Sequence, residues 1–159
     1  MSAGRDDEPR RPDRLLVVVA HPGDGADGID ARVRTWVETG TIAHLACGTS
    51  GELGGADPAA DPLEVAARQE AAQRSSADAA GYEAVTFLHR PHGALVNDLA
   101  TREQLVRLIR AFRPDTLATF DPRLVIGADG EIVHVDHREV GQAVLDAVEP
   151  AATPMAFRQ

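Results

Sequence analysis

The chain has 159 residues, the usual size of one globular domain and long enough to bury a substantial core. Its apolar share of 43% and charged share of 26% are those of an ordinary globular protein. The formal net charge of −9 argues against nucleic acid or an anionic membrane as the main partner. All 16 basic residues are arginine, which excludes chemistry that needs a lysine, such as Schiff-base formation or a Walker phosphate loop.

The only cysteine, Cys47, has no partner for an internal disulfide and no cysteine neighbours for a zinc site. The longest strongly apolar run, residues 15–20, is too short for a membrane span or a signal-peptide core. Residues 1–13 mix both charges with prolines, so we predict a disordered leader followed by a single domain over residues 14–159. We expect a cytoplasmic protein without a membrane span.

Strand and helix patterns alternate along the rest of the chain. Strands are predicted over residues 15–20, 41–47, 84–88 and 116–120, and helices over residues 29–39, 62–80, 101–112 and 136–148. The helix over residues 62–80 has the clearest start, with Asp61 as its N-cap and Pro62 in its first position. Repeated strand–helix units require parallel strands joined by right-handed crossovers. The predicted class is therefore α/β, with an open, mostly parallel sheet and helices on both faces.

Most of the histidines follow the ends of predicted strands, where open α/β sheets bind their ligands. After the first, third and fourth strands the chain carries His21, His89, His92, His134 and His137. Only His44 falls within a strand, and we interpret it as a surface or hydrogen-bonded sheet residue. The sequence therefore predicts a cluster of imidazoles at one edge of the sheet.

His21 and Asp24 are three residues apart in a predicted turn, and His137 can add a second imidazole from another strand end. Two histidines and one carboxylate with an open fourth position are a known ligand set for catalytic zinc. The alternative is that His21 and Asp24 form a turn-capping pair without a metal. Asp136 is a candidate for the outer partner that fixes the tautomer of an imidazole.

The other polar segments carry weaker signals. The glycine-rich residues 48–55 lack both a lysine and a dinucleotide fingerprint, so we interpret them as an active-site wall and not as a phosphate cradle. Cys47 is interpreted as a small buried apolar residue and not as a nucleophile. Residues 68–70 are interpreted as a solvated helical face.

Several motifs, in their order and spacing, resemble the PIG-L/LmbE-like family of zinc-dependent N-deacetylases. They are Val17-Val18-Val19-Ala20-His21-Pro22-Gly23-Asp24, Thr49-Ser50-Gly51-Glu52-Leu53-Gly54-Gly55, Phe87-Leu88 with Pro91-x-Gly93-x-Leu95, Arg113-Pro114-Asp115, and His134-Val135-Asp136-His137-Arg138. The resemblance covers roughly residues 15–157. It implies a Rossmann-like three-layer sandwich and a hydrolase that removes an acetyl group from an N-acetylated amino sugar, such as N-acetylglucosamine, a glycoconjugate or a related small molecule.

The resemblance also implies a role for individual residues. His21, Asp24 and His137 correspond to the ligands of the Zn²⁺ cofactor, and Arg68 and His92 lie at or near substrate-contacting positions. His134 corresponds to the imidazole that polarises the carbonyl or stabilises the tetrahedral intermediate. Asp136 is the catalytic-site carboxylate expected to support the histidine pair.

The chain departs from the family pattern at three points. Gly23 stands where the family has the aspartate that acts as general base, and His92 stands where it has a sugar-contacting aspartate. Relatives also continue beyond residues 156–157, so the resemblance implies a C-terminally truncated domain. We expect an impaired hydrolase; the alternatives are a non-catalytic metal- or sugar-binding relative and an α/β domain without a metal.

The strand predicted over residues 116–120 is expected beside the first strand, with no partner on its outer side. Its side chains include no charge that would discourage pairing with another chain. We therefore expect a homo-oligomer formed through this edge.

Overall fold

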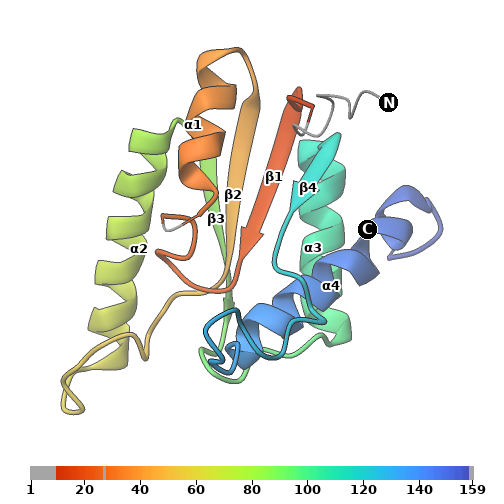
Figure 1. Cartoon of the computed structure of the whole chain (residues 1–159). Coiled ribbons are helices and arrows are strands. Elements are labelled where there is room, and N and C mark those ends of the chain that lie inside the picture. The colour runs from red at the N-terminus through yellow and green to blue at the C-terminus, as the bar shows by residue number, and fades with distance from the viewer. Residues whose placement is uncertain (1–9, 27, 158–159) are drawn as a thin grey trace, which may run out of the picture.

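A computed structural model describes residues 10–26 and 28–157. Strands and helices alternate in the predicted order (Figure 1). They are β1 (Arg14–Val19), α1 (Asp30–Glu38), β2 (Ile42–Thr49), α2 (Pro62–Ala80), β3 (Ala84–Arg90), α3 (Leu99–Phe112), β4 (Thr116–Ala118) and α4 (Val135–Ala152). The predicted α/β class is confirmed.

The four strands form one parallel sheet in the order β3-β2-β1-β4. Leu16 of β1 aligns with His44 of β2 on one side and with Leu117 of β4 on the other. From β1 the chain first builds outward to β2 and β3, and then returns to place β4 on the opposite side. The carboxyl end of β1 therefore lies at a topological switch point, where open α/β sheets bind ligands.

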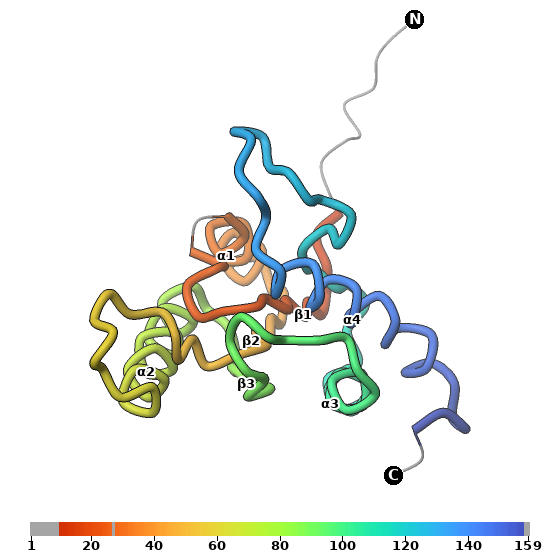
Figure 2. Tube along the Cα trace, turned by 90° about the horizontal axis from the view of Figure 1, so that it is seen from below, coloured from red at the N-terminus to blue at the C-terminus, as the bar shows by residue number. Residues whose placement is uncertain are grey.

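Helices cover both faces of the sheet (Figures 1 and 2). Because side chains alternate along a strand, Leu15 and Val17 of β1 face the layer of α1 and α2, whereas Leu16 and Val18 face α3 and α4. All four side chains are at most 1% exposed. The continuous apolar run of β1 is thus explained by burial on both faces, as predicted.

The helix boundaries follow their capping residues. The side chain of Asp61 accepts a hydrogen bond from the amide of Leu63, and Gly81 ends α2 with a φ of 88°, so this helix is confirmed at its predicted bounds. Helix α3 begins at Leu99, two residues earlier than predicted, because Asp98 caps it through the amide of Thr101. Helix α4 is capped by a histidine, His134.

Strand β4 is shorter than predicted and ends at Ala118 instead of residue 120. Beyond it, the ring of Phe120 stacks on His137 with ring centres 4.0 Å apart and an angle of 3° between the planes. This packing takes the chain out of the sheet. The segment that connects β4 to α4 then projects on the side of α1 (Figure 2), where Ile126 and Ile132 form an isolated antiparallel bridge.

The end of the predicted leader is tied to the sheet. The carbonyl oxygen of Pro12 accepts a 2.6 Å hydrogen bond from the hydroxyl of Thr41, and that of Asp13 accepts one from the amide of Ile42. Residues 1–9 lie outside the described part of the chain. Among the helices that the structure describes, none combines the length and the apolar character needed to cross a membrane.

Candidate functional site

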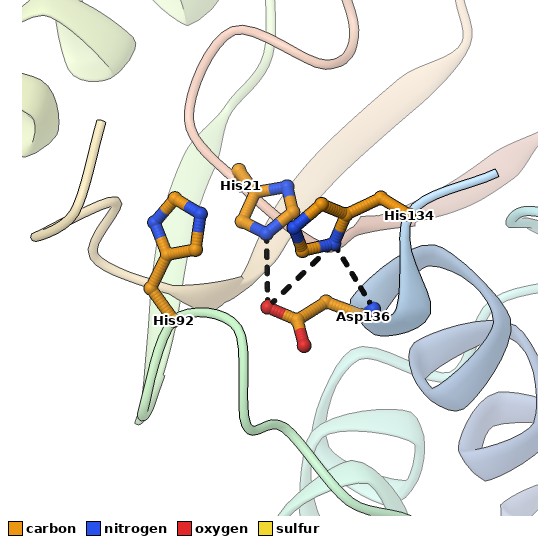
Figure 3. Close-up of side chains that lie close together, drawn as sticks. All are labelled: His21, His92, His134 and Asp136. Atoms are coloured by element: carbon orange, nitrogen blue, oxygen red, sulfur yellow. Dashed lines mark hydrogen bonds and ion pairs between the residues drawn. The ribbon is translucent and has the colours of Figure 1, made fainter. Parts of the chain in front are cut away.

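Four histidines and two aspartates gather at the carboxyl end of the sheet. His21 and Asp24 follow β1, His92 follows β3, and His134, Asp136 and His137 lie at the start of α4. Figure 3 shows the part of this cluster that surrounds Asp136. Loops that are far apart in the sequence meet here because β1 is central and its carboxyl end lies at the switch point.

One group within the cluster consists of His21, Asp24 and His137. Oδ2 of Asp24 lies 3.5 Å from Nδ1 of His21 and 3.4 Å from Nε2 of His137. The same oxygen accepts hydrogen bonds from the backbone amides of Ala20 and His21, at 3.1 and 2.7 Å. The turn after β1 therefore holds the carboxylate between the two imidazoles.

The spacing of these donor atoms fits a metal ion. Ligand atoms about 2.1 Å from a tetrahedral zinc lie roughly 3.4 Å apart, which matches both separations at Asp24. Nε2 of His21 lies 3.0 Å from Oδ2 of Asp136. A proton on Nε2 that is donated to Asp136 leaves the lone pair on Nδ1, the atom that faces Asp24 and His137. Metal-binding histidines commonly have such a carboxylate partner.

Asp136 is fully buried and joins two loops of the site. Its carboxylate accepts the backbone amide of Gly93 at 2.6 Å and that of Leu95 at 3.2 Å, in addition to the imidazole of His21. These bonds fix the loop after β3 against the start of α4. The carboxylate predicted to orient a histidine is therefore in contact with one.

His134 is the N-cap of α4, and its Nδ1 accepts the amide of Asp136 at 3.1 Å. A neutral imidazole that accepts through Nδ1 carries its proton on Nε2. The side chain is 41% exposed, so the ring is accessible from solvent. The helix cap thus makes His134 a hydrogen-bond donor toward the site.

The charges in the cluster stabilise one another. Burial opposes the charged form of His21, but its hydrogen bonds to Asp24 and Asp136 raise its pKa above the ordinary value. Burial also opposes ionisation of Asp24, yet hydrogen bonds from His137 and His21 hold the pKa of this carboxyl well below its usual range. Burial lowers the pKa of His92, and so does the nearby charge of His21. Asp24 is consequently ionised, as a metal ligand must be.

Gly23 lies within the turn after β1, with a left-handed φ of 94°. Its amide donates a 2.6 Å hydrogen bond to Oε1 of Gln73, a side chain of α2 that is only 3% exposed. A Cβ atom added to Gly23 would meet no atom within 4 Å. Gln73 was not predicted as a site residue, although a glutamine on the inward face of an alanine-rich helix is a detectable signal.

The two predicted substrate contacts lie in different surroundings. The ring of His92 packs against His21 with centres 4.3 Å apart, and its backbone amide donates to Glu52 at 2.7 Å. His92 therefore belongs to the cluster. Arg68 is exposed on α2 and makes no hydrogen bond or ion pair with the residues that the structure describes. The structure does not bring it into the cluster.

His89 forms a separate group with Ser50 and Glu70. The hydroxyl of Ser50 donates to Glu70 at 2.6 Å and lies 2.9 Å from Nδ1 of His89, which adopts a φ of 52°. The interpretation of residues 68–70 as a solvated face is therefore wrong for Glu70. The interpretation of His44 is confirmed, because its ring contacts the hydroxyl of Thr86. Cys47 is buried, and burial raises the pKa of its thiol, as expected of an inert residue.

The fold and the cluster define a doubly wound α/β domain with a histidine–carboxylate site at its switch point. Residues 16–148 match the family model described as PIG-L: GlcNAc-PI de-N-acetylase, and the chain belongs to this family. The predicted resemblance is thereby confirmed.

Curated relatives include two deacetylases. The chain is 26% identical to diacetylchitobiose deacetylase of Thermococcus kodakarensis over 141 residues, which cover 89% of the chain and 51% of that protein. It is 28% identical to 1D-myo-inositol 2-acetamido-2-deoxy-alpha-D-glucopyranoside deacetylase of Kineococcus radiotolerans over 182 residues, covering 95% of the chain and 48% of that protein. The chain thus spans about half the length of these relatives.

Solved structures share the fold. N,N'-diacetylchitobiose deacetylase from Pyrococcus horikoshii aligns with a TM-score of 0.83 and 23% identity, over 92% of this chain and 53% of that one. GalB, the 4-carboxy-2-hydroxymuconate hydratase from Pseudomonas putida KT2440, aligns with a TM-score of 0.78 and 19% identity, over 90% of this chain and 58% of that one. Since one of these neighbours is named as a hydratase, the fold by itself does not determine the reaction.

Proposed function

We propose that the chain is a zinc-dependent hydrolase that removes an acetyl group from an N-acetylated amino sugar or a related small molecule. Membership of the PIG-L family and the two curated deacetylases support this reaction class. The observation that carries the proposal is the convergence of His21, Asp24 and His137, with the second nitrogen of His21 held by Asp136.

In this proposal His21, Asp24 and His137 hold the zinc ion, through Nδ1, a carboxylate oxygen and Nε2. When bound, the ion supplies Lewis acidity to a water molecule and to the amide carbonyl of the substrate. Asp136 keeps the proton of His21 on Nε2 and so keeps the coordinating lone pair on Nδ1.

His134 acts on the substrate carbonyl. Its Nε2–H donates a hydrogen bond to the carbonyl oxygen, and this hydrogen bond strengthens as negative charge develops on the oxygen. The amide of Asp136 holds the ring in this tautomer through Nδ1. His92 lines the site beside His21, whereas Arg68 is proposed to contact only a part of the substrate that extends toward α2.

The position of Gly23 limits the rate, because no carboxylate stands there to accept the proton of the attacking water. Losing a positioned base typically costs about 10²–10⁴ in rate. We therefore propose slow turnover. The second candidate, a non-catalytic metal- or sugar-binding relative, is favoured by the same glycine.

Acetate release tests the proposal. The purified chain is incubated with diacetylchitobiose and zinc, and the acetate released is compared with that in the presence of a chelator. Asp24→Asn and Asp146→Asn serve as test and control, because Asp146 is a carboxylate of α4 that bonds Asn97 and Gln142 instead of the cluster. Zinc-dependent acetate release that only Asp24→Asn abolishes supports the hydrolase. Zinc and sugar binding without acetate release supports the non-catalytic relative.

A further inference from the structure

The two ring nitrogens of His21 face two different groups of donor atoms. Nδ1 faces Asp24 and His137, the pair proposed above as its partners on zinc. Nε2 faces Oδ2 of Asp136 at 3.0 Å, and Figure 3 shows the rings of His92 and His134 on either side of His21. His21 is thus shared between two clusters.

The second cluster has the chemistry of a metal site in its own right. One donor atom from each of His21, His92, His134 and Asp136 lies within 4.8 Å of every other. The carboxylate of Asp136 is fully buried, and buried carboxylates in proteins are paired or coordinate a metal. Imidazole nitrogens combined with one carboxylate oxygen suit zinc, nickel or copper.

His92 is the residue that completes this group. Its ring lies 4.3 Å from that of His21 and 5.7 Å from that of His134, measured between ring centres. Figure 3 shows one ring nitrogen of His92 on the side that faces His21. His92 therefore directs a donor atom toward the rest of the cluster.

We propose that His21, His92 and Asp136 form a second site for a divalent transition-metal ion, with His134 beside its open position. His21 bridges the two ions, so the proton on its Nε2 leaves to solvent when the second ion binds. The second site rests on the proposed zinc centre in that both use His21, but its other ligands, His92 and Asp136, are different.

Metal stoichiometry tests the second site. After equilibration with zinc and removal of free metal, the wild-type chain is expected to retain two equivalents, and His92→Ala and His137→Ala one each. His89→Ala is the matched control, because His89 lies near the carboxyl end of β3 but contacts Ser50 and Glu70 instead of the cluster. It is expected to retain two equivalents. His92→Gln replaces His92→Ala if circular dichroism shows that the alanine variant is unfolded.

The variants also separate this proposal from the zinc centre. If the wild type retains only one equivalent of zinc, and this zinc is kept by His92→Ala but lost by His137→Ala, the second site is overturned and the zinc centre is supported. If the wild type retains one equivalent of zinc that is kept by His137→Ala but lost by His92→Ala, the second site is supported and the zinc centre is contradicted. Two equivalents retained in the His92 variants also overturn the second site.

Discussion

Nε2 of His21 lies 3.0 Å from Oδ2 of Asp136, although the two residues are 115 positions apart in the chain. This contact links the turn after β1 to the first turn of α4, the two segments that carry all three proposed zinc ligands. A proton on Nε2 that is donated to Asp136 leaves the lone pair of His21 on Nδ1, the nitrogen that lies 3.5 Å from Oδ2 of Asp24.

Replacing Asp136 by asparagine is expected to weaken zinc binding about 10–100-fold, since removing the carboxylate partner of a metal-binding histidine typically has this effect. The side chain keeps its size, so the variant is expected to fold. Competition against a chelator of known affinity measures the change. Asp146→Asn, on the same helix but bonded to Asn97 and Gln142, is the control and should bind zinc like the wild type. Equal affinity in both variants would show that Asp136 does not orient His21.

Replacing Gly23 by aspartate is expected to raise the rate of acetate release on the order of 10²-fold by restoring a proton acceptor. Space is open for a Cβ atom, but the left-handed φ of 94° is unfavourable for any residue with a Cβ and is expected to lower stability by about 1–2 kcal/mol. Gly23→Asn carries the same strain without the base, so it should lose stability and gain no rate. Equal rates in the two variants would contradict a missing base as the defect.

Asp115 is expected to make stability depend on acid pH. Its Oδ2 accepts the amides of Asp13 at 2.9 Å and Arg14 at 2.8 Å. Desolvation by itself would raise the pKa of its carboxyl, but hydrogen bonds from Thr116, Arg14 and Asp13 outweigh this effect and lower it. Because the pKa of the folded state lies below that of the unfolded state, the stabilisation is present above about pH 4 and is lost as the pH falls through the folded value.

Urea unfolding of the wild type and of Asp115→Asn tests this dependence. The wild type is expected to be more stable at neutral pH, and the difference is expected to shrink at pH 3. A difference that stays constant over this range would show that ionisation of Asp115 contributes nothing.

The outer edge of β4 is expected to support self-association. Beside it lies a cavity of about 740 Å³ whose lining includes Leu117, Phe120 and Leu145. The strand is only three residues long, which weakens the edge as a template, so these apolar side chains should supply most of the attraction. Sedimentation at several concentrations should show a dimer that Leu145→Lys dissociates. Leu63→Lys, at an exposed site on α2, should not change it. A concentration-independent monomer contradicts this expectation.

The fold could be predicted from the sequence because its signals are local. The apolar run of β1, the Asp61 cap and the Gly81 stop of α2 each determine structure within a few residues, and all three predictions are confirmed. The end of β4 could not be predicted in this way. It depends on Phe120 leaving the sheet to stack on His137, a residue of a helix that follows a long connecting segment.

The site could be predicted only in part, for the same reason. The ends of the predicted strands place His21, Asp24, Asp136 and His137 at one edge of the sheet, where the structure also has them. Gly23 bonds Gln73 and Ser50 bonds Glu70, and both partners lie on α2. Whether they face the site or solvent depends on how the helix is rotated about its axis, which the sequence does not determine locally. Arg68, on the same helix, faces solvent.

The zinc centre is tested most directly by a crystal structure of the zinc-loaded chain, with anomalous scattering recorded on both sides of the zinc absorption edge. The account predicts an anomalous peak roughly 2.0–2.2 Å from Nδ1 of His21, a carboxylate oxygen of Asp24 and Nε2 of His137. A zinc-loaded crystal without a peak between these three side chains would contradict it.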